Sequence, residues 1–175
     1  MGAARVKRVT HITTGAAVAL PVAVGLSPAA AAGAIFMGMA GAVMPDYADL
    51  RSDLRRVLRH RGVSHSLLFA AAATGLTWLI LSALSNVADA RVRLPGELVG
   101  PLLLAFALGV ASHLLLDAAT PSGIRPLLPI SQFRLRILPP GLRIPTGGAV
   151  DSFVHLVTSL VVMLGILYLV YERLR

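Results

Sequence analysis

The sequence predicts an all-α integral membrane protein: a helix bundle with about five membrane-embedded segments and a metal site at its cytoplasmic face. Of the 175 residues, 56% are apolar and only 14% are charged, whereas soluble domains carry about 25% charged residues. The charges are also unevenly placed, since four long stretches contain no Asp, Glu, Lys or Arg. The chain has no cysteine, which excludes a disulfide framework, thiolate-bound zinc, an iron–sulfur cluster and a cysteine nucleophile.

The uncharged stretches predict the helices in chain order. The first covers 9–45 and is too long for one crossing, because about 20 apolar residues span the hydrocarbon core. Pro21 and Pro28 favour two short helices hinged near Ser27 over the alternative of one long kinked helix. The later stretches each suit one crossing and cover 66–88, 98–116 and 152–171. We expect residues 1–175 to form a single membrane-embedded domain.

The basic residues give the orientation. One group precedes the first apolar stretch and two lie between later ones; together they consist of Arg5, Lys7, Arg8, Arg51, Arg55, Arg56, Arg59, Arg61, Arg125, Arg134, Arg136 and Arg143. The positive-inside rule places them on the cytoplasmic side of the cytoplasmic (inner) membrane. The N-terminus then lies in the cytoplasm, and the C-terminus lies on the outer side of the membrane. The same rule accounts for the net charge of +8, so we expect no nucleic-acid partner. A membrane scaffold that recruits DNA or acidic proteins is an alternative.

Nine His and Asp residues fall at one predicted membrane face. They are His11, Asp46, Asp49, His60, His65, His113, Asp117, Asp151 and His155. Such groups are costly within a membrane and usually face an interior site. His113 and Asp117 are four residues apart, which places them on one helix face, one turn from each other. The same spacing separates Asp151 from His155, and it suits a metal site.

The donor types narrow the choice of metal. Histidine nitrogen and carboxylate oxygen suit zinc best, with manganese, iron or magnesium as alternatives. The candidates exceed one tetrahedral site, which favours two or three ions of the kind used in phosphoryl transfer. Several of the candidate ligands can instead have structural roles. Asp46 and Asp49 can cap a helix or pair with arginines, His60 can bind phosphate, and His155 can serve helix packing.

Four sequence strings together resemble the YdjM family of membrane-bound, metal-dependent hydrolases, some of which are under LexA control. They are His11-x3-Gly15, Pro45-Asp46-x2-Asp49, His60-Arg61-Gly62-Val63-Ser64-His65-Ser66-Leu67 and Ser112-His113-x3-Asp117-x2-Thr120-Pro121-x-Gly123. The resemblance covers residues 11 to about 155. It implies a ligand set of His11, Asp46 or Asp49, His65, His113 and Asp117, with a further acid at Asp151. The family looks distantly like zinc-dependent phospholipase C and P1 nuclease, which are helical phosphodiesterases.

We therefore predict a metal-dependent hydrolase of a phospholipid or another lipid phosphate ester at the cytoplasmic membrane boundary. Asp46, Asp49 or Asp151 would accept a proton, and Arg61 would contact the phosphate. Three serines are candidates for orienting imidazoles: Ser64, Ser66 and Ser112. A transporter with a His/Asp relay is the main alternative. The candidate ligands are confined to one face of the membrane, which favours an enzyme over a transporter, because a transport path should continue across the membrane midplane.

The predicted topology is testable by cysteine labelling, because the chain has no cysteine of its own. A cysteine placed at Ala3 should react only from the cytoplasm, whereas cysteines at Ala90 and at the C-terminal Arg175 should react from outside. A C-terminal label reachable only from the cytoplasm would contradict the odd number of crossings.

Overall fold

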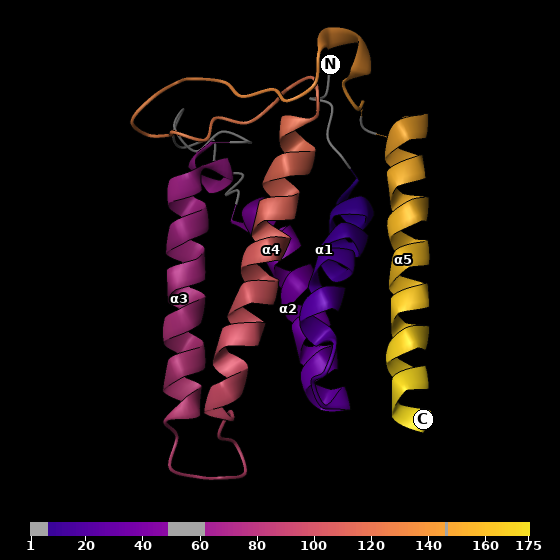
Figure 1. Cartoon of the computed structure of the whole chain (residues 1–175). Coiled ribbons are helices and arrows are strands. Elements are labelled where there is room, and N and C mark those ends of the chain that lie inside the picture. Colours follow the sequence, from indigo (N-terminus) through magenta and orange to yellow (C-terminus); the bar gives the residue numbers. More distant parts are fainter. Residues whose placement is uncertain (1–6, 49–61, 146) are drawn as a thin grey trace.

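The computed structural model describes residues 7–48, 62–145 and 147–175, and it contains five α-helices (Figure 1). They are α1 (Arg8–Ala23), α2 (Pro28–Tyr47), α3 (Leu67–Ser85), α4 (Val99–Ala118) and α5 (Ala149–Leu174). No strand occurs in these ranges apart from one isolated β-bridge. The all-α prediction is confirmed, and the first apolar stretch forms two helices, as expected.

The hinge between α1 and α2 occupies residues 24–27. Gly25 has a φ of +80°, a left-handed conformation that glycine adopts without steric cost. The Ser27 side chain accepts a hydrogen bond from the backbone N–H of Ala30 at 3.4 Å, and Pro28 fills the first helical position. Both features are typical of a helix start. The chain therefore turns back, and α2 returns to the end where α1 began.

Four helices are long and apolar enough to cross a membrane. They are α2, α3, α4 together with its preceding turn η3 (Gly96–Leu98), and α5. Helix α1 has 16 residues and is about 24 Å long, shorter than a hydrocarbon core of about 30 Å. Most apolar side chains of α5 are exposed, as expected for a helix that faces lipid. The integral membrane bundle is thus confirmed.

Helices α1, α2 and α4 form the centre of the bundle, with α3 beside α4 and α5 beside α1 (Figure 1). The starts of α1, α3 and α5 and the ends of α2 and α4 lie at the same end (Figure 1). We call this the site end, because the predicted His and Asp residues occur there. The connection between α3 and α4 lies at the opposite end (Figure 1).

Glycines allow the three central helices to approach closely. Gly38 of α2 faces Gly15 of α1 on one side and Gly109 of α4 on the other. A Cβ atom at any of the three would overlap the neighbouring backbone. Helices in a membrane gain little from hydrophobic burial, and they associate through such small-residue contacts. We call this set the glycine contact.

The glycine contact can be tested by two matched substitutions. Gly109→Ala should lower the free energy of unfolding by about 1–3 kcal/mol, because the added Cβ would meet Gly38 and Ala42. Gly75→Ala, in α3, meets nothing within 4 Å and should leave stability unchanged or raise it by up to about 1 kcal/mol. Unfolding in detergent, followed by helical circular dichroism, measures both. Equal losses would refute the contact.

Candidate metal centre

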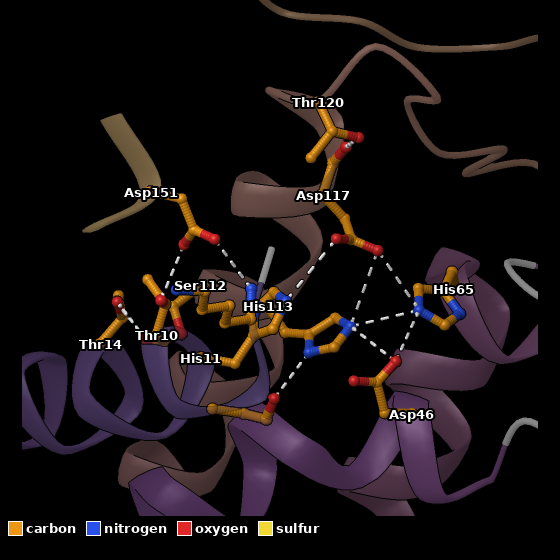
Figure 2. Close-up of polar contacts among 12 residues, drawn as sticks. Thr10, His11, Thr14, Asp46, His65, Ser112, His113, Asp117, Thr120 and Asp151 are labelled. Carbon is orange, nitrogen blue, oxygen red and sulfur yellow. Dashed lines mark hydrogen bonds and ion pairs between the residues drawn. The ribbon is translucent and has the colours of Figure 1, made fainter. Parts of the chain in front are cut away.

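Five of the predicted ligands meet at the site end (Figure 2). They are His11 near the start of α1, Asp46 near the end of α2, His65 in the short helix η2 (Val63–His65), and His113 and Asp117 near the end of α4. The three histidines and Asp117 are buried, and the Asp46 side chain keeps 16% of its surface exposed. Ionisable groups in such surroundings are costly unless they are paired or bind a cation.

The glycine contact positions three of these ligands. Each lies four residues from a small residue at the contact, in the pairs His11 with Gly15, Asp46 with Ala42, and His113 with Gly109. Residues four apart share a helix face, one turn from each other. The three side chains therefore lie one turn from the close approach of α1, α2 and α4.

The surroundings of His113 fix its tautomer. Its Nδ1 lies 2.6 Å from the carbonyl oxygen of Ala42. A carbonyl only accepts, so we assign the hydrogen to Nδ1, which leaves the lone pair of the neutral ring on Nε2. That Nε2 lies 3.2 Å from the Nε2 of His65 and faces two carboxylates (Figure 2). Metal-binding histidines usually donate their second ring N–H in this way.

The imidazoles of His65 and His113 both lie near the carboxylates of Asp46 and Asp117. The Nε2 of His65 lies 3.4 Å from Asp117 Oδ2 and 3.7 Å from Asp46 Oδ1. The Nε2 of His113 lies 3.9 Å and 4.0 Å from the same two oxygens. Ligands of a tetrahedral zinc ion lie about 3.3–3.6 Å apart, given bond lengths of about 2.0–2.2 Å. The donor types and these separations fit a metal held by Asp46, His65 and His113.

His11 extends this group beyond Asp117. Its Nε2 lies 3.7 Å from Asp117 Oδ1, and its ring stacks on His113 with centroids 3.9 Å apart and an interplanar angle of 21°. Asp117 therefore directs one oxygen toward His65 and the other toward His11. The ligand atoms of His11, His113 and Asp117 all lie within 4.8 Å of one another, as do those of Asp46, His65 and His113.

Asp151 lies apart from this group, contrary to its predicted role as a ligand or acid. It is buried in the first turn of α5 and accepts hydrogen bonds from Thr10 Oγ1 at 2.8 Å and from the backbone N–H groups of Gly147 at 2.8 Å and Lys7 at 3.2 Å (Figure 2). These bonds engage both of its oxygens. Asp151 thus fixes the start of α5 to the start of α1, next to His11.

His155 also contacts α1 rather than the ligand group. Its Nδ1 lies 3.2 Å from Thr13 Oγ1, which in turn lies 2.8 Å from Thr158 Oγ1. Asp151 and His155 therefore do share a helix face, as their spacing predicts, but that face packs on α1. Together with Thr10, Thr13 and Thr158 they form a polar seam between α1 and α5.

The remaining candidates divide into two kinds. Asp49, His60 and Arg61 lie outside the described residues, so their roles stay predictions. Of the three candidate serines, only Ser64 contacts a ligand, with its Oγ 2.9 Å from His65 Nδ1. Ser66 instead caps α3, and Ser112 donates to a carbonyl of its own helix.

Two groups around the site were not anticipated. Thr10 holds Asp151, and the Ala42 carbonyl holds His113. No sequence pattern reveals a carbonyl acceptor, because every residue has one. The sequence did contain one signal of a close helix contact here. Gly38 and Gly41 are small residues in an uncharged stretch, and such residues indicate that another helix approaches α2 closely.

Fold and site define a helical integral membrane protein with a buried His/Asp group at one end of its bundle. The chain belongs to the YdjM inner membrane protein family, whose family model matches residues 6–173. This confirms the resemblance carried by the four sequence strings. Searches of curated proteins and of solved structures found no match.

If the group binds metal, loss of one ligand should reduce the metal content of the purified protein. His113→Ala and the nearly isosteric Asp117→Asn should each weaken affinity more than about 100-fold, because even a group that only orients a ligand contributes about 10- to 100-fold. His155→Ala removes an imidazole outside the group and should retain the metal. Mass-spectrometric metal analysis of the detergent-purified, folded proteins measures the metal content of the parent and of each variant. Full metal content in both site variants would refute the centre.

Proposed function

We propose that this protein is a metal-dependent hydrolase of the membrane that acts on a lipid phosphate. One observation carries the proposal: five ligand side chains from α1, α2, η2 and α4 meet in one largely buried group whose dimensions fit a metal. A purely structural role would not require three imidazoles and two carboxylates to meet inside a membrane bundle, where each is costly to bury.

We propose zinc as the metal, which His11, Asp46, His65, His113 and Asp117 would hold. Four protein ligands around one ion would fill a tetrahedral site, whereas five ligands divided between two ions leave positions for water and substrate. When bound, zinc activates water and stabilises negative charge on phosphoryl oxygens.

The protein's own groups would orient the ligands and move the proton. The Ala42 carbonyl and Ser64 Oγ hold the rings of His113 and His65. Asp46, the most exposed of the five ligands, is the proposed proton acceptor, with Asp49 as the second candidate. Arg61 is the proposed phosphate contact, because its planar guanidinium can donate two parallel hydrogen bonds to a phosphate.

A lipid substrate follows from the location of the group. The ligands lie at the ends of helices whose outer faces are apolar, so a molecule anchored in the leaflet can arrive laterally. The arginine distribution supports a cytoplasmic position for this end. On this basis we propose catalysis at the cytoplasmic boundary of the inner membrane.

The buried core argues against a transporter. Among the described residues, the buried polar and ionisable side chains are Thr10, His11, Ser64, His65, Ser66, Ser112, His113, Asp117, Thr120 and Asp151. All of them come from segments at the site end. The core cluster farther along the bundle contains only alanine and leucine among its buried residues. An ion or proton path would need polar groups there as well.

The test is turnover of a membrane lipid extract by zinc-loaded protein, read by mass spectrometry. Parent protein should hydrolyse a lipid phosphate, and Asp117→Asn should abolish turnover together with metal binding. Water-soluble phosphodiesters should be poor substrates. If the protein moved protons or metal ions across proteoliposome membranes and hydrolysed no lipid, the hydrolase proposal would be wrong and the protein would be a carrier.

Arg61→Lys tests phosphate recognition separately from metal binding. The substitution keeps the charge but loses the planar fork, so turnover should fall about 10- to 100-fold with metal content unchanged. Arg93→Lys, at the opposite end of the bundle, is the matched control and should behave as the parent. Unimpaired turnover in both Arg61→Lys and Arg61→Ala, or faster cleavage of esters that lack phosphate, would exclude the lipid-phosphate assignment.

A further inference from the structure

The connection from α4 to α5 begins with a hairpin at the site end (Figure 1). Ile124 and Leu135 pair through two antiparallel backbone hydrogen bonds of 3.1 and 2.9 Å. Gly123, directly before the first arm, has a φ of +62° and lies against the backbone of Leu135. We call residues 123–137 the basic hairpin.

The pairing of the hairpin gathers positive charge. Arg125 follows Ile124 on one arm, while Arg134 and Arg136 flank Leu135 on the other. Residues 118–150 contain four arginines and no acidic residue. Arg125 donates to Gln132 Oε1 at 3.3 Å, and none of the hairpin arginines forms an ion pair with a carboxylate in the part of the chain that the structure describes.

The arginines lie close enough to repel one another. Arg134 is exposed, and its pKa is lowered from its ordinary value, first by desolvation and then by the positive charges of Arg125 and Arg136. Like charges held together in this way attract an anion with several acceptor oxygens, such as a phosphate.

Apolar side chains project beside these charges. Ile130 at the tip of the hairpin is 91% exposed, and Phe133 is 56% exposed. Exposed apolar groups next to basic ones are typical of segments that lie in the membrane interface, where the apolar groups enter the lipid and the charges meet headgroups. A nucleic acid would satisfy the arginines but would leave Ile130 in water.

Backbone hydrogen bonds fix the hairpin to the metal-site elements. The N–H of Ile137 donates to the carbonyl of Ala118 at 3.1 Å, and the N–H of Leu67 donates to the carbonyl of Pro126 at 2.9 Å. Ala118 directly follows Asp117, and Leu67 lies two residues after His65. The hairpin therefore sits at a fixed place beside the ligand group.

We propose that the basic hairpin is a docking surface for anionic lipid headgroups of the adjacent leaflet. Arg125, Arg134 and Arg136 bind headgroup phosphates, while Ile130 and Phe133 insert between the lipids. The inference goes beyond the proposed hydrolysis, because docking requires neither metal nor turnover.

The first experiment compares two Arg-x-Arg pairs in the full-length protein. Native mass spectrometry would follow the titration of detergent-purified protein with phosphatidylglycerol and, separately, with phosphatidylcholine. Replacing Arg134 and Arg136 by Gln should weaken phosphatidylglycerol binding about 30-fold and leave phosphatidylcholine binding unchanged. The control replaces Arg91 and Arg93 by Gln, at the opposite end, and should change binding less than about 3-fold. Equal effects of the two pairs would overturn the proposal.

The second experiment locates the tip of the hairpin. Phe133→Trp, introduced with Trp78→Phe so that it is the single tryptophan, should be quenched by brominated lipids in nanodiscs that contain phosphatidylglycerol. Absence of quenching would contradict insertion. A DNA duplex whose binding depended on Arg134 and Arg136, while phosphatidylglycerol binding did not, would also overturn the proposal. Metal content and turnover, measured on the same samples, test the hydrolase independently.

Discussion

The close approach of α1, α2 and α4 is the constraint on which the other features depend. Gly38 lies between Gly15 and Gly109 with no room for a Cβ at any of the three positions. One turn away, the Nε2 atoms of His65 and His113 lie 3.2 Å apart and 3.4 to 4.0 Å from the nearest carboxylate oxygens, so a small outward shift of one helix would separate them. The same approach brings the Ala42 carbonyl within reach of His113. Helix packing and metal-site geometry are therefore parts of one arrangement.

The site end contains two buried carboxylates in different surroundings. Asp117 lies near three imidazoles, whose ring nitrogens can bind a cation that would neutralise it. Asp151 accepts hydrogen bonds from a hydroxyl and two backbone N–H groups, which stabilise its charge without a metal ion. One carboxylate is thus suited to chemistry and the other to joining helices. Because Thr10 precedes His11, the joint at Asp151 also restrains the ligand at the start of α1.

The sequence predicted the helices and the convergence of the ligands, because both follow from where charges are absent and where arginines occur. Two local signals were informative: the Ser27-Pro28 hinge predicted the division of the first apolar stretch into two helices, and the spacing of His113 and Asp117 predicted that they share a helix face. The role of Asp151 could not be predicted: a spacing of four residues gives a shared face but not the helix that this face contacts. The basic hairpin could not be predicted either, because its arginines indicated only the topology of the chain. The pairing of Ile124 with Leu135 depends on a turn within an irregular, proline-rich segment.

The order of the ligands along the chain bears on how the protein matures. Every ligand of the group precedes α5, so the ribosome completes the set before it synthesises the last helix. The glycine contact joins α1, α2 and α4 and needs no residue of α5. A nascent chain inserted as far as α4 therefore already contains the complete group of candidate ligands. Helix α5, joined to α1 through the polar seam, would then lock a centre that is already assembled.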